Sequence, residues 1–151
     1  MSMIALPETF RFSVFNSVGS SIPSAFQPSV SGRRVRFDST GTTSYEAAAF
    51  TFLSLGTTLS IGQNSYVTGS TFSNTASGWL GGEFLFSAFA SGNASGNITL
   101  YMEMSPDGGT TWPSPASANG VGGGIVVAVI GYASTTTAST ASTTRVQAFE
   151  L

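Results

Sequence analysis

The chain is 151 residues long, has a net charge of −2, and contains neither histidine nor cysteine. Its five basic residues are all arginines, so lysine is absent too. Without these residue types the chain cannot form a Ser-His-Asp triad, a Cys-His dyad, a Schiff-base lysine, a P-loop or a His/Cys zinc site. We therefore expect a protein that is not an enzyme and that holds no metal or other cofactor.

The rest of the composition predicts one globular domain with a surface that associates easily. Apolar residues make up 41% of the chain and charged residues only 8%, where about 25% is usual. The length predicts a single domain over residues 1–151 with its own core. Few charges give weak protection against association, so we expect partners, including further copies of the chain, to cover much of the surface.

The N-terminal third begins with a strand signal. Residues 9–15 alternate between apolar and polar, which predicts a half-buried strand. Residues 16–31 are rich in Ser, Pro and Gly and predict an extended loop. We therefore expect residues 1–30 to include a less compact N-terminal arm. No apolar run approaches the roughly 18 residues that span a bilayer, and the N-terminus lacks the features of a signal peptide.

The middle of the chain predicts short strands separated by turns. A strand is expected over residues 34–37 and a turn over 38–41. Residues 44–53 combine alanines, which favour helix, with aromatic residues, which favour strand, and we assign a strand. Two further short strands are expected at 59–67 and 70–72.

The last third carries the strongest strand signals. Residues 82–90 and 97–104 are expected to be neighbouring strands of a meander. The nearly continuous apolar run 124–132 predicts a central strand that is buried on both faces. The alternative for this run is core on one face and a subunit interface on the other. A Ser/Thr/Ala tract at 135–144 predicts a loop, and 144–150 a final strand.

These elements predict an all-β fold. No stretch sustains a helical period, and seven or eight short strands are separated by Gly, Ser and Thr turns. This pattern is typical of an antiparallel β-sandwich or jelly roll.

The most specific motif is the octet SPDGGTTW at residues 105–112, which fits the S-x-D-x-G-x-T-W pattern of an Asp-box. An Asp-box forms a turn and carries no catalysis. The Asp and Ser side chains bind turn backbone, Gly supplies a positive φ, and Trp folds back over the turn. We expect a hairpin turn with a largely buried Trp, formed by Ser105, Asp107, Gly109, Thr111 and Trp112.

Three of the five positive charges lie close together at Arg33, Arg34 and Arg36. Arginine pairs bidentately with carboxylates, so this segment is a candidate contact with an anionic protein surface. A solvated strand edge is the alternative. We do not expect nucleic-acid binding, because the net charge is negative and no stripe of basic and aromatic residues is present.

Two further sites are candidates. Glu83 and Glu103 are the one carboxyl pair that could serve a glycosidase, provided that their strands are neighbours. A sugar-stacking platform would need a coplanar row of exposed aromatic residues. Its candidates are Tyr66, Trp79, Tyr101, Trp112 and Tyr132.

Residues 82–87 and 96–113 resemble small β-sandwich structural proteins of tailed bacteriophages, the capsid cement or decoration proteins. The resemblance implies a non-enzymatic virion protein that is made in the host cytoplasm, forms trimers and binds the major capsid protein at the capsid surface. It implies no small-molecule substrate and no membrane. The alternative function is a carbohydrate-binding β-sandwich of a tail fibre or adhesin.

Overall fold

The computed structural model describes residues 6–24, 27–54, 60–75, 78–90, 95–112, 124–132 and 143–150. These residues form nine β-strands and no α-helix. The strands are β1 (Thr9–Asn16), β2 (Ser29–Phe37), β3 (Thr43–Tyr45), β4 (Phe50–Ser54), β5 (Ser65–Ser73), β6 (Gly81–Ala90), β7 (Gly96–Met104), β8 (Ile125–Tyr132) and β9 (Thr143–Glu150). The all-β prediction is confirmed.

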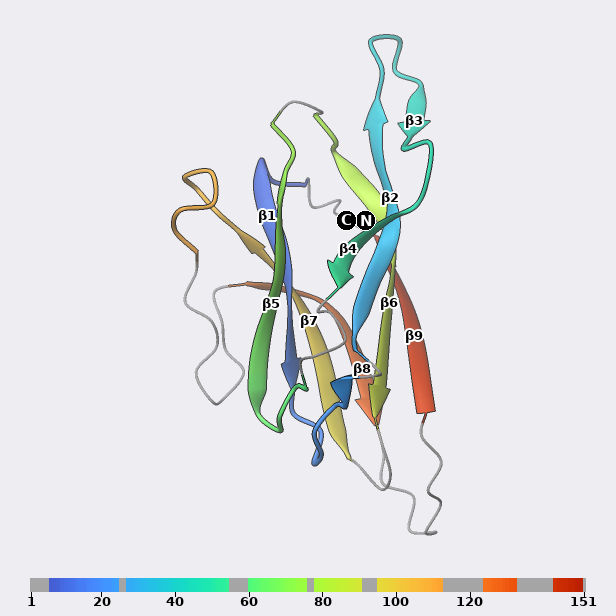
Figure 1. Ribbon diagram of the computed structural model, residues 1–151. Coiled ribbons are helices and arrows are strands. Elements are labelled where there is room, and N and C mark those ends of the chain that lie inside the picture. Colours follow the sequence, from blue (N-terminus) through green and yellow to red (C-terminus); the bar gives the residue numbers. More distant parts are fainter. Residues whose placement is uncertain are drawn as a thin grey trace.

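The strands form two antiparallel sheets that pack face to face (Figure 1). Sheet 1 has the order β5-β1-β7-β8. Sheet 2 has the order β3-β2-β6-β9, and β4 also pairs with β2, next to β3. The predicted β-sandwich is confirmed, whereas this strand order does not establish a jelly roll. No helix in the described ranges is long and apolar enough to cross a membrane.

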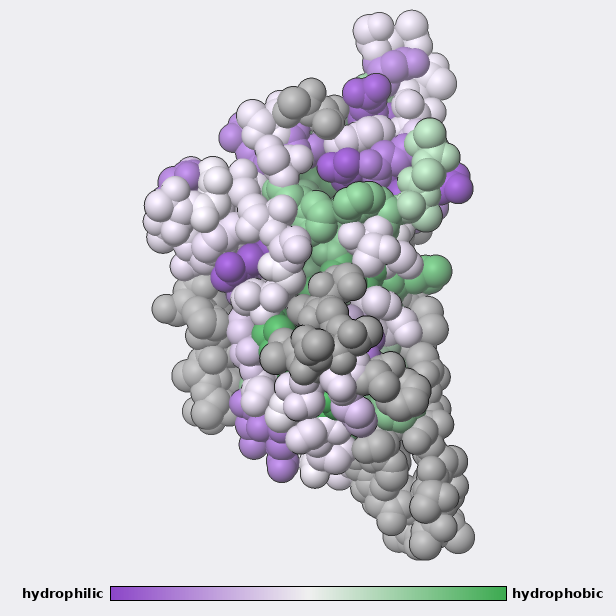
Figure 2. Space-filling model, viewed as in Figure 1, coloured by the Kyte–Doolittle hydropathy of each residue, from purple (hydrophilic) through white to green (hydrophobic). Residues whose placement is uncertain are grey.

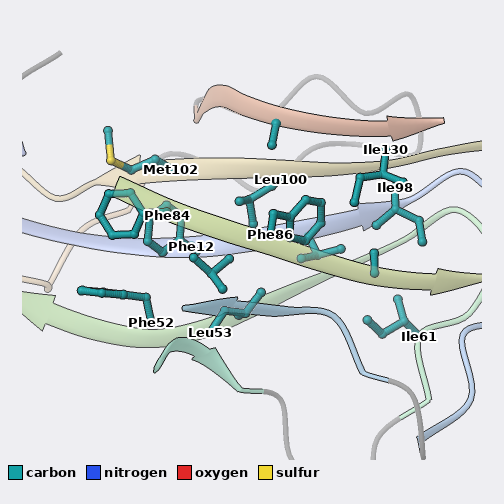
Figure 3. Close-up of a cluster of buried hydrophobic side chains, with 14 of the residues drawn as sticks. Phe12, Phe52, Leu53, Ile61, Phe84, Phe86, Ile98, Leu100, Met102 and Ile130 are labelled. Atoms are coloured by element: carbon teal, nitrogen blue, oxygen red, sulfur yellow. The ribbon is translucent and has the colours of Figure 1, made fainter. Parts of the chain in front are cut away.

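The core between the sheets is built largely from phenylalanine rings. Phe12 of β1 packs edge-on against Phe52 of β4, with ring centroids 6.2 Å apart, and against Phe84 of β6, at 5.8 Å. Phe52 and Phe84 are themselves 5.1 Å apart. Edge-to-face contacts of this kind add to the free energy gained by burying the rings. Figure 3 shows the aliphatic side chains of β7 continuing this cluster along the sandwich.

The expected meander of β6 and β7 is wrong. β6 belongs to sheet 2 and β7 to sheet 1, so the chain crosses the sandwich between them. Both strands have apolar side chains at alternate positions, Phe84 and Phe86 on β6 and Leu100 and Met102 on β7, and all four are buried. Opposite sheets allow these two apolar faces to bury each other, which neighbouring positions in one sheet would not.

Residues 6–22 of the N-terminal region pack into the fold, contrary to the less compact arm expected for residues 1–30, while residues 1–5 lie outside the described part of the chain. β1 lies between β5 and β7 in sheet 1. Leu6, Val18 and Ile22, which flank β1, are buried, and Ile22 forms an isolated antiparallel bridge with Ile61. The apolar side chains dispersed among the Ser and Pro residues therefore anchor this segment.

β8 is an edge strand of sheet 1, and the expected burial on both faces is wrong. Its pairing with β7 skips Val127, which forms a bulge. The bulge changes the phase of the strand, so that Ala128 and Ile130 are buried while Val126 and Val129 are 53% and 42% exposed. This matches the alternative of a strand with core on one side only.

Other boundaries differ in detail. The strand expected over 44–53 is interrupted by residues 46–49, and β2 begins five residues before the strand expected at 34–37. The turn expected at 38–41 is confirmed: the Asp38 carboxylate accepts hydrogen bonds from the backbone of Thr40 and Thr42. The Ser/Thr/Ala tract lies mostly outside the described residues, and β9 confirms the final strand.

We predict that Gly32→Ala lowers the free energy of unfolding by about 1–3 kcal/mol, the usual cost of overpacking. A Cβ on Gly32 would lie 2.8 Å from the Phe84 ring and would also meet the carbonyl oxygen of Glu83. Urea denaturation measures the change. Gly19→Ala is the matched control, because its nearest neighbour, the carbonyl oxygen of Ser95, is 3.8 Å away. Equal stability of the two variants would contradict the prediction.

Candidate functional site

The Asp-box residues form the expected turn. One carboxylate oxygen of Asp107 accepts hydrogen bonds from the backbone of Thr110 (3.1 Å) and Thr111 (2.6 Å) and from the Ser105 hydroxyl (2.8 Å). The Ser105 hydroxyl in turn accepts from the backbone of Gly109 (2.8 Å), which has a φ of 102°. Hydrogen bonds from the Thr111 side chain and backbone, and then from Ser105 and Thr110, lower the pKa of Asp107 to about 2.

Two details of this turn differ from expectation. β7 and β8 are antiparallel neighbours, but the connection between them runs from Ser105 to Gly124, so the octet begins a long connection and is not a tight hairpin. Trp112 is half-buried, and its indole nitrogen donates to the carbonyl of Gly109 at 2.9 Å. The ring therefore has one face available to a further group.

That group is Arg11 of β1. Its guanidinium carbon lies 4.1 Å from the centroid of the Trp112 ring, a cation–π contact. The Arg11 Nε donates to one oxygen of Glu103 at 2.5 Å, and the Tyr66 hydroxyl donates to the other. We call Arg11, Tyr66, Glu103 and Trp112 the Arg11 cluster. It lies on the outer face of sheet 1, because Phe10 and Phe12 of β1 and Met102 of β7 occupy the inner face.

The Arg11 cluster holds a buried charge pair. Glu103 is fully buried, and the Arg11 side chain is 16% exposed. Burial, together with the hydrogen bond to Glu103, raises the pKa of Tyr66 well above its usual value. Each oxygen of Glu103 already accepts a hydrogen bond, and the side chain is fully buried, so the carboxylate is closed to a substrate. The role of the Arg11 cluster is therefore structural: its contacts hold β1, β5, β7 and the Asp-box together.

Glu83 and Glu103 do not face a common cleft. Glu83 is exposed on the outer face of sheet 2, next to the inward-facing Phe84 of β6, and Glu103 lies on the outer face of sheet 1. Sheets in a sandwich are about 10 Å apart, so carboxylates on opposite outer faces exceed the roughly 5–10 Å of a glycosidase pair. Within the described part of the chain, no group of three or more His, Cys, Asp or Glu residues could hold a metal ion.

The three clustered arginines do not form one surface. They alternate along β2, so Arg33 is on the outer face of sheet 2 while Arg34 and Arg36 are on the inner side. Arg34 pairs with Glu46 at 2.5 Å. The guanidinium carbons of Arg34 and Arg36 lie 5.4 Å and 4.9 Å from the Trp79 ring centroid. Arg34 is therefore part of the packing and is not a free surface charge.

The described aromatic candidates do not form a coplanar exposed row. Tyr66 and Tyr101 are 6.1 Å apart at an interplanar angle of 52°, and Tyr101 is buried. Trp112 contacts Arg11, while Trp79, at the other sheet, contacts Arg34 and Arg36. The remaining candidate, Tyr132, is the last residue of the edge strand β8, and its side chain lies outside the described part of the structure.

Arg11 is the residue of this site that sequence reasoning missed. The sequence suggested Glu83 as the partner of Glu103, but in the structure Glu103 pairs with Arg11, which is 92 residues away in the chain. The available signal was a charged side chain in each of two alternating strands, both at positions that face away from the core. Comparison of the sequence with models of protein families and with curated proteins, and of the fold with solved structures, finds no match.

We predict that Glu103→Gln lowers the free energy of unfolding by about 3 kcal/mol, because the variant leaves the largely buried Arg11 charge without its carboxylate. The double variant Arg11→Met/Glu103→Leu removes both charges and should lose less stability than Glu103→Gln. Urea denaturation of both variants tests this. An equal or larger loss in the double variant would show that the ion pair is not what Glu103 supplies.

We also predict that Asp107→Asn lowers the melting temperature at pH 7, and that the difference from the parent disappears as the pH falls from about 4 to about 2. The pKa of Asp107 is lower in the folded protein than the roughly 3.9 of an unfolded Asp. The charge therefore stabilises the fold above pH 4 and ceases to do so once the folded carboxylate is protonated.

Melting curves recorded by circular dichroism between pH 2 and pH 7 measure this difference. Glu8→Gln, which removes an exposed carboxylate outside the turn, controls for the change in net charge. A constant difference across the whole pH range would refute the assignment to the Asp107 charge.

Proposed function

We propose that the protein is a non-enzymatic structural protein of a virion, a cement or decoration protein that binds the major capsid protein of a tailed bacteriophage. The observation that carries the proposal is an apolar surface on a chain with few charges. Among the described residues, eight large apolar side chains are between 39% and 53% exposed. They are Phe37, Tyr45, Phe50, Leu80, Leu85, Met104, Val126 and Val129. Where such groups are contiguous, as at Phe50 and the alanines before it, an exposed apolar patch is typical of proteins that work by association.

The surface that supports a capsid contact best is the start of β4 and the segment before it. Residues 47–50, three alanines and Phe50, are largely open to solvent. Figure 2 shows a hydrophobic band in this region, with hydrophilic residues bordering it above. Phe50 continues the aromatic core outward, with its ring 5.7 Å from that of Phe72. We call residues 47–50 the β4 patch.

Of the three arginines that the sequence suggested as a capsid contact, only Arg36 is part of the proposal. Arg36 contacts the Trp79 ring and is exposed on the same side of β2 as the β4 patch, and we assign its guanidinium to a carboxylate of the capsid. Arg34 is held by Glu46, and Arg33 lies on the other face of the sheet. A contact of a few kcal/mol per copy suffices for a cement protein, because the repeating lattice multiplies it.

The experiment is to band particles from the source culture in a density gradient and to quantify this chain by mass spectrometry. We expect a copy number comparable with that of the major capsid protein. Recombinant Phe50→Ser should bind stripped particles less tightly than the parent, because it removes an apolar contact while half of its ring is already exposed. Val126→Ser, at an exposed position on the outer face of sheet 1, is the matched control. Absence from particles together with binding to a glycan array would favour the adhesin instead.

A further inference from the structure

The two outer faces of the sandwich differ in how much of their surface is covered. On sheet 1, Phe15, Tyr101 and Glu103 face outward and are nevertheless buried. On sheet 2, Phe89 of β6 faces outward and is buried, but the outward side chains around Arg33 and Glu83 are open to solvent. We call this open surface the β2–β6 face. It is formed by Arg33, Val35, Phe37, Tyr45, Glu83 and Leu85.

The β2–β6 face has complementary residues on its two central strands. β2 and β6 are antiparallel, and their outward residues form cross-strand pairs in register: Ser31 with Leu85, Arg33 with Glu83, and Val35 with Gly81. Each pair joins a large side chain to a small one, or a positive charge to a negative one. If a second copy of this face is laid over the first with its β6 above β2, each side chain therefore meets a complementary one.

The charges of the central pair are open to a partner. Arg33 and Glu83 are both exposed, and in the described part of the chain the ion pairs are Arg11–Glu103 and Arg34–Glu46, not this one. Glu83 accepts a hydrogen bond from the Tyr45 hydroxyl at 3.4 Å. Arg33 and Glu83 thus lie in the middle of an apolar face with their charges uncompensated by each other.

We propose that the β2–β6 face binds the same face of a second copy of this chain. The two copies are related by a two-fold axis that is parallel to the strands, lies midway between the two facing sheets, and runs above the line between β2 and β6. That axis places β2 of one copy over β6 of the other. Arg33 then faces Glu83 of the second copy and Leu85 faces Ser31, each contact occurring twice. Two-fold contacts are self-complementary in this sense.

The size of the face suits a weak dimer. Its strands β2, β3 and β6 have nine, three and ten residues, which at about 3.3 Å per residue and about 4.8 Å between strands span on the order of 350 Å² in projection. A stable interface buries roughly 800 Å² of accessible surface on each partner, so we expect a dimer that dissociates on dilution. Stacked sheets in sandwiches pack in the same way. This contact is independent of the proposed function, since it requires no particle.

The test is the oligomeric state of the isolated protein, measured by sedimentation velocity in low salt. The parent should form dimers. Arg33→Glu places a glutamate against Glu83 of the other copy at both contacts, and Glu83→Arg likewise creates two repulsive arginine contacts. Each variant alone should have a dimer dissociation constant at least tenfold higher than that of the parent.

The mixture of these two variants is the decisive sample. In a mixed dimer, the glutamate introduced in one copy faces the arginine introduced in the other, and the unchanged Glu83 of the first copy faces the unchanged Arg33 of the second. Both contacts therefore become attractive. Only contact between copies can restore dimers on mixing, because repair within one chain would need both changes in the same molecule. Dimers that persist in both single variants, or that fail to return in the mixture, would overturn the proposal, as would a trimeric parent.

Two further variants separate an apolar contribution from a folding defect. Leu85→Asp, at an exposed position, should abolish dimers while leaving the circular dichroism spectrum unchanged. Phe50→Ser, in the β4 patch, should dimerise as the parent does. If Phe50→Ser dissociates and Leu85→Asp does not, the interface between copies is the β4 patch and not the β2–β6 face.

Discussion

Phenylalanine rings meeting edge to face between the two sheets are the contact on which the rest of the molecule depends. The chain has no cysteine to cross-link the sheets, so burial and hydrogen bonding must join them. Burying one such ring contributes roughly 1.5–3 kcal/mol. Phe52 also attaches the short edge strand β4 to the core, through rings on β1 and β6. The glycine at position 32 follows from the same packing, because the Phe84 ring occupies the space that a side chain there would need.

The ionic groups are arranged around this core in two different ways. On sheet 1, Arg11 and Glu103 are buried together, and the Asp-box places Trp112 over them. On sheet 2, Arg33 and Glu83 remain exposed. A pair that is buried within the chain fixes the position of a loop, whereas charges left in water can be neutralised by another molecule. The buried pair thus serves the stability of the fold, and the exposed pair is the one that we propose to serve association.

Local patterns predicted local structure well in this chain. The alternation over residues 9–15 predicted β1, and the Asp and Gly residues of two turns predicted the hydrogen bonds of Asp38 and Asp107. Contacts between segments far apart in the sequence could not be predicted from local patterns. The alternating pattern of β6 and β7 is the same whether the strands share a sheet or face each other across the core. Likewise, no pattern showed that Arg11 would find Glu103, or that a bulge at Val127 would change which valines face solvent.

The positions of the arginines also determine how the folded protein meets proteases. Trypsin cleaves after lysine and arginine, and with no lysine in the sequence only five bonds are available to it. All five arginines lie within strands: one in β1, three in β2 and one in β9. The backbone there is committed to the sheets and must separate from its neighbours before it can enter a protease active site. Tryptic digestion of this protein therefore reports opening of the sandwich itself, not the accessibility of its loops.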